Sequence, residues 1–212
     1  VPGKGRFTLG PDASIVIDSK ASAEIAKSAS ILASEIQRFY GVKLPVISRD
    51  HVPNGKCIRL SLDCGVLPGK AEAYTLSVTA DCVDIKGMDA RGLFYGTQSF
   101  FQLLEKDDAL KISAKCATVR DWPDIPFRGM MIEMGGQDSF EWINRTLEML
   151  AMHKFNVVVF GQTGDHNIKW DSHPELAQKN ALTATQLRAF AAKSREFFLE
   201  PVPLIQSIGH NT

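Results

Sequence analysis

The sequence lacks several features that would assign its class directly. Its 212 residues carry 24 basic and 24 acidic side chains, so neither charge is in excess. A general nucleic-acid binder usually presents a basic surface, which this balance argues against. There is no run of roughly 18 apolar residues, so we expect no membrane-spanning helix. The apolar content of 44% instead predicts a folded chain with a packed core.

Cysteine is scarce, and its spacing points to no specific chemistry. The four residues, Cys57, Cys64, Cys82 and Cys116, form no C-x-x-C pair, which argues against a zinc site or a redox motif. Free thiols and one disulfide in an exported protein both fit this pattern. The sequence also has no H-E-x-x-H, no G-x-G-x-x-G and no Walker loop. We therefore expect no metal and no cofactor.

The first 120 residues predict an α+β domain. A β-branched run at 15–17 precedes an apolar stripe over 25–39, which indicates a helix that ends at Gly41. Asp89 is placed to cap a second helix that reaches Leu104. We expect a mostly antiparallel sheet with two helices. Between the helices, alternating or apolar runs predict strands at 58–62, 74–78 and 83–86.

The segment Asp121-Trp122-Pro123-Asp124-Ile125-Pro126 interrupts these patterns, because two prolines so close together block regular structure. We place a domain boundary there, with domains over 1–120 and 121–212. The second domain alternates strand, helix, strand, helix, strand, which predicts parallel pairing. Its expected strands are 130–132, 157–160 and 202–208, and its expected helix caps are the boxes Asp138/Glu141 and Thr183/Gln186.

Three parallel strands are too few to close a (β/α)8 barrel, which needs roughly 250 residues in all. We therefore expect the first part of a truncated TIM barrel. The alternative is a three-stranded unit that stands alone. Either arrangement leaves a parallel edge exposed, and we expect this edge to promote self-association.

Polar residues follow the ends of the three predicted strands. In barrels the site lies at the carboxyl ends of the strands. Convergent polar groups suit a hydroxyl-rich ligand, because each buried sugar hydroxyl needs a partner. For Glu133, which ends the first strand, a structural alternative is an ion pair with Arg128. Trp170 fits a sugar-stacking platform or a loop anchor equally well. The candidate substrate-binding or site-supporting residues are Glu133, Asp165, Gln206, His210 and Asn211.

Four segments carry motifs that occur together in one family. They are Leu93-Phe94-Tyr95-Gly96-Thr97-Gln98 and the stretches 121–129, 150–156 and 203–210. In this order they resemble the small-domain helix, the barrel-opening motif, the second-strand signature and the third-strand motif of family-20 glycoside hydrolases, the β-N-acetylhexosaminidases. The Gln-containing third-strand motif resembles a divergent branch that includes the hexosaminidase D type.

This resemblance implies a zincin-like α+β domain without a zinc motif, followed by a TIM barrel. It also implies a retaining exo-glycosidase that removes terminal N-acetylhexosamine by substrate-assisted catalysis. The family's catalytic Asp-Glu pair follows the fourth strand, so we expect no catalytic residue in this chain and no activity from the 212 residues alone. A sugar-gripping Arg of typical members would fall near Gly136, and a His-x-His run is replaced by Val159-Phe160-Gly161.

Two other functions fit the same residues. One is a non-catalytic carbohydrate-binding or scaffolding module, which the replaced Arg and His positions favour. The other is a different exo-glycosidase with a similar small domain, such as an α-glucuronidase. Carbohydrate is the expected partner in each case. Polymer-degrading glycosidases usually work outside the cytoplasm, so we expect export, and Val1 as first residue fits a removed signal peptide or an excised piece equally.

Overall fold

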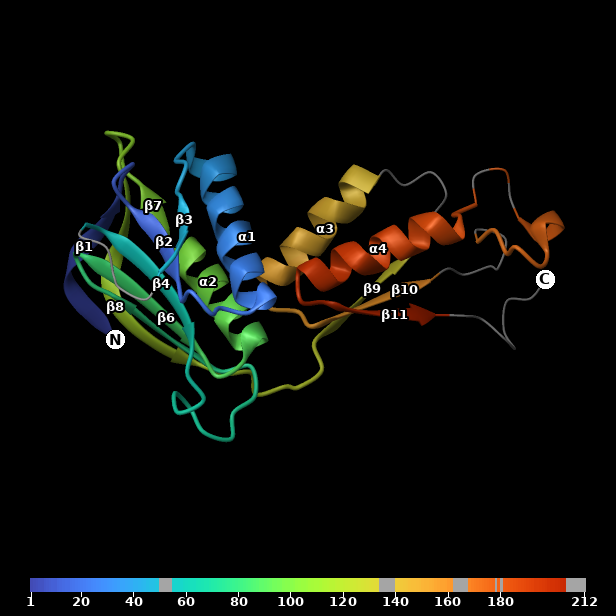
Figure 1. Cartoon of the computed structure of the whole chain (residues 1–212). Coiled ribbons are helices and arrows are strands. Elements are labelled where there is room, and N and C mark those ends of the chain that lie inside the picture. The colour runs from blue at the N-terminus through green and yellow to red at the C-terminus, as the bar shows by residue number, and fades with distance from the viewer. Residues whose placement is uncertain (50–54, 134–139, 162–167, 178, 180, 205–212) are drawn as a thin grey trace. The chain divides into compact units, whose positions relative to one another are not determined.

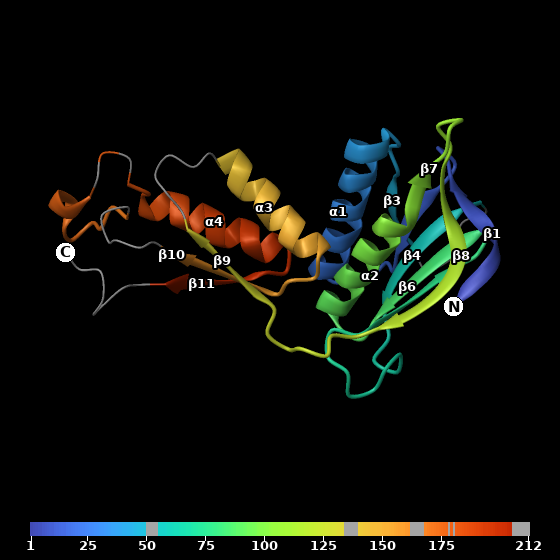
Figure 2. The ribbon, with the colours of Figure 1, turned by 180° about the vertical axis from the view of Figure 1, so that it is seen from behind.

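The computed structural model describes the chain except residues 50–54, 134–139, 162–167, 178, 180 and 205–212. The chain divides into two units, Val1–Asp124 and Ile125–Thr212. Each unit has its own sheet and its own helices, which Figures 1 and 2 show from opposite sides. Within the described part of the chain, no helix is both long enough and apolar enough to cross a lipid bilayer.

The first unit is a mixed sheet with two helices on one face (Figure 1). Its strand order is β1-β8-β5-β6-β4-β2-β3, and β7 pairs with β8. Four of the pairings between described strands are antiparallel and three are parallel, so the sheet is more mixed than predicted. The strands are β1 (Pro2–Leu9), β2 (Ser14–Ile17), β3 (Val46–Ser48), β4 (Cys57–Leu62), β5 (Tyr74–Val78), β6 (Cys82–Gly87), β7 (Leu104–Lys106) and β8 (Ile112–Asp121).

Helix α1 (Ala23–Tyr40) follows the predicted apolar stripe and ends as predicted. Gly41 has a positive φ of 74°, and its N–H donates to the Gln37 carbonyl at 2.9 Å. A left-handed residue at this position is a common helix terminator, and glycine adopts it without steric cost. One stripe residue differs from the prediction. Phe39 is 55% exposed, and its ring packs edge-on against Phe101 at a centroid distance of 5.4 Å.

Helix α2 (Ala90–Leu103) contains the Leu93–Gln98 motif and lies close against the sheet. The predicted cap is present, since the Asp89 carboxylate accepts from the Gly92 N–H at 2.8 Å. A Cβ atom on Gly96 would lie 2.5 Å from Cγ2 of Ile85, and one on Gly92 would lie 2.2 Å from the Ala73 carbonyl oxygen. Only glycine permits so close an approach, so these two residues set the distance between α2 and the strands below it.

The second unit is a parallel three-stranded sheet in the order β11-β10-β9, and both pairings are parallel as predicted. The third strand begins at Glu200, two residues before the predicted start, and its predicted end lies outside the described residues. The elements are β9 (Gly129–Glu133), α3 (Phe140–Met152), β10 (Val157–Gly161), a 3-10 turn (Pro174–Leu176), α4 (Ala184–Glu196) and β11 (Glu200–Leu204).

One of the two predicted helix caps of this unit is present, and its central strand is buried mainly on one face. The Thr183/Gln186 capping box is present at the start of α4, whereas Asp138 of the other box lies outside the described residues. The continuously apolar run Val157–Phe160 predicts a strand that is buried on both faces. Val158 is fully buried, but Val159 is only half-buried, so one face of the strand is covered more completely than the other.

Candidate functional site

The carboxyl ends of the three strands in the second unit lie level with one another. Glu133 at the end of β9 is paired in register with Gly161 at the end of β10. Gly161 is in turn paired with Leu204 at the end of β11. The chain segments that follow the strands therefore leave the sheet from the same edge, which is where sites form in parallel α/β folds. The Glu133 residue is exposed at this edge.

Glu133 is the one predicted site residue that the structure describes. Asp165 follows β10 in the chain, and Gln206, His210 and Asn211 follow β11, but all four lie outside the described residues. The strand register thus fixes where these segments begin. The cluster of their side chains stays a prediction.

A hollow of about 580 Å³ lies beside Glu133, between β9 and α3. Four residues of α3, Trp142, Arg145, Thr146 and Met149, line this hollow, and the sequence analysis did not assign them to a site. The signal for them is their spacing, because positions i, i+3, i+4 and i+7 share one helix face. Trp142 and Met149 of this face are each about half exposed. The residues lining the hollow are Met130, Met131, Ile132 and Glu133 from β9, and Trp142, Arg145, Thr146 and Met149 from α3.

At the opposite, amino-terminal end of the strands, a set of hydrogen bonds centred on Asn156 holds the chain together, and we call this set the clasp. Asn156 is only 5% exposed. Its side-chain carbonyl accepts from the Arg128 N–H at 2.9 Å, and its amide donates to the Pro126 carbonyl at 2.6 Å. Its backbone carbonyl accepts from the Glu200 N–H at 2.8 Å. One side chain and its own backbone therefore connect the chain at the starts of β9, β10 and β11.

Arg128 contributes to the same clasp through its guanidinium group. Its Nε donates to the Lys154 carbonyl at 2.7 Å, and its Nη1 donates to the Ile125 carbonyl at 2.9 Å. These bonds hold the segment before β9 against the turn before β10. Arg128 thus has a structural position at the amino-terminal end of β9, while Glu133 lies at the carboxyl end of that strand.

The loop after β10 holds Trp170 by backbone contacts. The Trp170 carbonyl accepts from the His173 N–H at 3.2 Å, and the ring is half-buried. His173 is exposed, with Nδ1 3.2 Å from the Glu175 carboxylate. These contacts suit a loop anchor and leave part of the Trp170 ring accessible. In the residues that the structure describes, no three His, Cys, Asp or Glu side chains are grouped so that they would hold a metal ion.

Comparison with known proteins gives consistent results. The family model "Glycosyl hydrolase family 20, domain 2" matches residues 1–122. A β-hexosaminidase of Porphyromonas gingivalis is 25% identical over 94% of this chain and 29% of its own length. A lacto-N-biosidase of Bifidobacterium bifidum is 26% identical over 98% of this chain and 18% of its own length. A mutant Streptomyces plicatus β-hexosaminidase, solved with its product GlcNAc, superposes with a TM-score of 0.80 at 25% identity.

That superposition covers 99% of this chain and 44% of the Streptomyces chain. The chain therefore spans less than half the length of each of these three relatives. The family model covers more than half of the chain, namely the first unit apart from its last two residues. On this evidence the chain belongs to glycosyl hydrolase family 20.

Proposed function

We propose that the protein is a retaining exo-glycosidase that removes terminal N-acetylhexosamine from glycans. The main support for the proposal is the register of the strands in a chain of family 20. The carboxyl ends of the three strands, at Glu133, Gly161 and Leu204, lie side by side. A parallel βαβαβ unit that directs its strand ends to one edge suits a sugar site at that edge. In this proposal residues 1–120 form the zincin-like domain, and 121–212 form the first part of a (β/α)8 barrel.

The proposed sugar site contains the residues that follow the three strand ends. Glu133 accepts hydrogen bonds from sugar hydroxyls, because a carboxylate is an acceptor with two oxygens. The other proposed members are Asp165, Gln206, His210 and Asn211. Together they offer carboxylate, amide and imidazole groups, which can satisfy both the donors and the acceptors of a hydroxyl-rich ligand.

The proposed chemistry is substrate-assisted. The carbonyl oxygen of the substrate's 2-acetamido group attacks the anomeric carbon, while a general acid protonates the departing glycosidic oxygen. Water then opens the resulting ring intermediate from the face that the leaving group vacated, so the configuration is retained. An internal nucleophile gains a large effective molarity over an external one. The residues of this chain hold and orient the sugar, and the Asp-Glu pair that catalyses these steps follows a fourth strand.

The hollow beside β9 supports the barrel part of the proposal. Strand β9 is an edge strand of its sheet, and its Met130 and Met131 are each nearly half exposed. A closed barrel has no edge strand, because its last strand pairs with its first. A final strand that pairs with β9 would cover these two methionines, and its helix would fill the hollow against Trp142.

The experiment is hydrolysis of chromogenic N-acetyl-β-glucosaminide and N-acetyl-β-galactosaminide by the full-length gene product. Turnover of either substrate with retention of configuration supports the proposal. The second candidate is a carbohydrate-binding module without turnover, which is favoured by Val159-Phe160-Gly161 in place of the family's His-x-His run. Sugar binding with no hydrolysis would establish that candidate, whereas cleavage of a chromogenic α-glucuronide alone would indicate an α-glucuronidase.

A further inference from the structure

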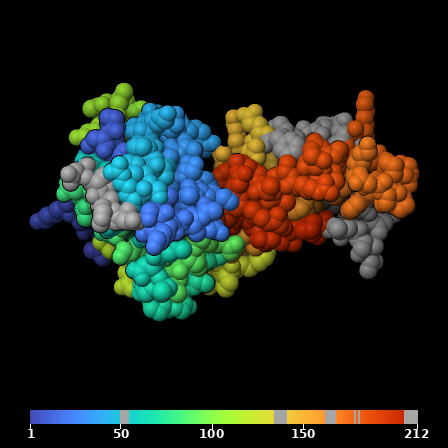
Figure 3. All heavy atoms as spheres, viewed as in Figure 1, coloured from blue at the N-terminus to red at the C-terminus, as the bar shows by residue number. Residues whose placement is uncertain are grey.

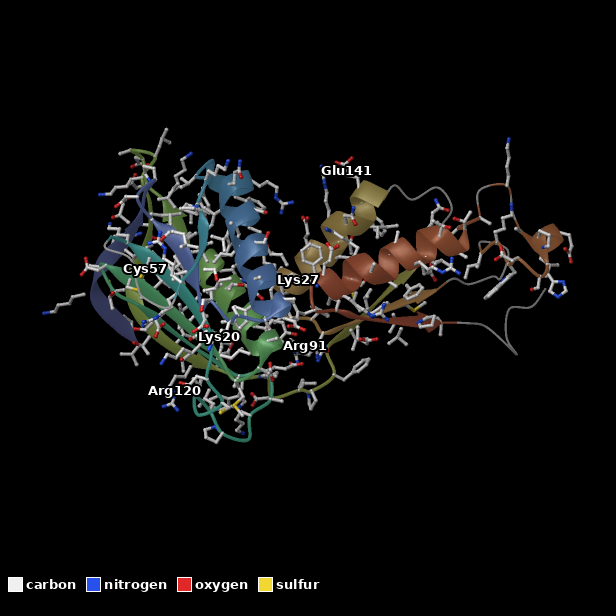
Figure 4. The ribbon with its side chains drawn as sticks, viewed as in Figure 1. Lys20, Lys27, Cys57, Arg91, Arg120 and Glu141 are labelled. Carbon is white, nitrogen blue, oxygen red and sulfur yellow. The ribbon has the colours of Figure 1, made fainter. Side chains whose placement is uncertain are left out.

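Two cysteines of the first unit are direct partners in the sheet. Cys57 opens β4 and Cys82 opens β6, and these parallel strands pair Cys57 with Cys82 in register. Their Sγ atoms are in direct contact at 2.6 Å, and no disulfide bond joins them. Figure 4 labels Cys57 among the strands of the sheet.

Both thiols lie on the sheet face that points away from α1 and α2. The residues that follow them, Ile58 and Val83, are fully buried in the core beneath the helices. Side chains alternate between faces along a strand, so the two cysteines point the opposite way. The next pair on the cysteine face is Arg59 with Asp84, whose side chains form an ion pair at 2.7 Å.

The exposure of the two thiols is unequal. Cys57 is only 1% exposed, whereas Cys82 is partly exposed. An oxidant from solution therefore reaches Cys82 first, and Cys57 is placed behind it as the second thiol. Burial, followed by the contact with Cys57, raises the pKa of the Cys82 thiol to about 12. Attack by Cys82 requires the thiolate, so we expect the reaction to be slow at neutral pH.

The backbone geometry suits a covalent bond between the two residues. Neighbouring strands lie about 4.8 Å apart, and disulfides form between residues whose Cα atoms are roughly 4.4–6.8 Å apart. The other two cysteines lack such a partner. Cys64 is exposed on the loop after β4, whose residues lie at the lower surface of the first unit in Figure 3, and Cys116 is buried in β8.

We propose that Cys57 and Cys82 form a disulfide that cross-links β4 to β6 when the protein meets a disulfide oxidant. The Cys82 thiolate attacks one sulfur of the oxidant and forms a mixed disulfide, releasing the first thiolate of the oxidant. The Cys57 thiolate then attacks the Cys82 sulfur and releases the second. The two cysteines lose two electrons and two protons in total, and the oxidant is reduced to two thiols.

The bond would act as a clamp on the first unit. It closes a loop between residues 25 positions apart, and this loop contains β5 and the loop that carries Cys64. Closing such a loop restricts the unfolded chain more than the folded one, which raises stability. For a protein of this size we expect the thermal midpoint to rise by about 10 °C on oxidation.

Peptide mapping tests the pairing directly. The protein is incubated with excess oxidised glutathione, its remaining thiols are alkylated, and it is digested with trypsin. Cleavage after Lys and Arg places the four cysteines on four different peptides, 57–59, 60–70, 71–86 and 116–120. We expect peptide 57–59 joined to peptide 71–86, and separation of the two by dithiothreitol. A sample in which both peptides stay alkylated or carry only glutathione overturns the proposal, as does a cross-link that involves Cys64 or Cys116.

Serine variants test the clamp. Cys82→Ser should abolish both the cross-linked peptide and the rise of the thermal midpoint on oxidation. Cys64→Ser, the matched control on the exposed loop, should leave both unchanged. If the cross-link forms in the unsubstituted protein but its thermal midpoint does not rise, the proposed pairing is correct and the proposed stabilisation by the disulfide is wrong. The outcome does not depend on glycosidase activity, so it is independent of the proposed function.

Discussion

At the scale of single residues, Asn156 connects the chain at the starts of the three strands of the second unit. Its side chain accepts a hydrogen bond from the Arg128 N–H and donates one to the Pro126 carbonyl, both in the segment that leads into β9. Sequence reasoning placed it only in a family motif. The signal available was a polar residue between Phe155 and Val157, at a point where a helix gives way to an apolar strand.

Asn156→Ala should lower the free energy of unfolding by about 1–2 kcal/mol, because it removes two part-buried hydrogen bonds, to the Arg128 N–H and to the Pro126 carbonyl. Chemical denaturation measures this. Asn144→Ala, at a half-buried position of α3, is the control and should cost no stability. Equal stability of the two variants would show that the clasp contributes little.

The Cys82 thiol makes stability depend on pH. Its pKa rises from 9.0 to about 12 through burial and the contact with Cys57, while nearby Arg59 acts in the opposite direction and Asp84 raises it further. Between these values the unfolded thiol has lost its proton and the folded thiol has kept it. The folded state then binds more protons, so stability falls as pH rises.

Under reducing conditions, the free energy of unfolding should therefore decline from pH 9 toward 12 in the unsubstituted protein. Cys82→Ser should decline less, because it lacks this proton. Denaturant titrations at several pH values give both slopes. Parallel slopes would mean that Cys82 titrates alike in the folded and unfolded protein.

At the scale of elements, the packing of α2 on the sheet depends on Gly96. Gly96→Ala places a methyl group 2.5 Å from Ile85 and 3.1 Å from the Tyr74 ring. We expect a loss of about 1–3 kcal/mol in unfolding free energy from overpacking, although alanine favours helix. Gly65→Ala is the control, because there the new methyl meets only the Asp63 carboxylate. If Gly96→Ala is as stable as the control, α2 moves to accept the methyl group without a loss of unfolding free energy.

The elements that sequence predicts are those with a clear apolar pattern, either a periodic stripe or a continuous run. The stripe of α1 and the run Val157–Phe160 are examples, and each forms the expected element. Strands β1 and β8 were not predicted. The β1 segment contains Pro2, Gly3 and Gly5, which disfavour strands. It becomes a strand because it pairs with β8, more than a hundred positions away in the sequence.

Strand β8 was missed for a different reason. Its buried positions include Ser113, Ala114 and Cys116, which are small and only weakly apolar. They are buried because β8 lies between β1 and β5 in the sheet. Local sequence carries little of that information, since a strand with neighbours on both sides is covered by its partners as well as by its own side chains.

The same limit applies to the candidate site. Glu133 was found because it ends an apolar strand, and its alignment with Gly161 and Leu204 follows from the parallel pairing. The Trp142 and Met149 side of α3 was missed, because these residues lie off the stripe that packs on the sheet. Strand periodicity locates the carboxyl ends of the strands, whereas a hollow lined by a helix face is found only in the packed structure.

At the scale of the whole molecule, the two edges of the parallel sheet differ. The Glu200 N–H points toward β10, because it donates to the Asn156 carbonyl. Backbone N–H groups alternate sides along a strand, so positions 201 and 203 face the outer edge of β11. Both are proline and have no N–H to donate. The outer edge of β11 therefore offers only carbonyl groups at these positions, whereas β9 offers both N–H and carbonyl groups, so β9 is the more open edge for pairing with a second copy of the chain.

A polypeptide of residues 1–212 alone should therefore self-associate through β9. Light scattering should give a mass above that of the monomer. Met131→Lys should lower this mass, because Met131 is 46% exposed on β9 and a charge at an edge strand opposes pairing. A stable monomer before substitution would show that the exposed edge does not drive association.

The central claim is that the strand ends of the second unit hold the sugar. Its most direct test is the kcat/KM of the full-length gene product for the chromogenic hexosaminide that it cleaves, measured with Glu133→Gln. Removing the charge from one hydrogen-bonded carboxylate predicts a decrease of about 10–100-fold. Glu196→Gln, on the exposed side of α4 where Glu196 pairs with Lys193, should leave kcat/KM unchanged. An unchanged kcat/KM in Glu133→Gln would contradict the account.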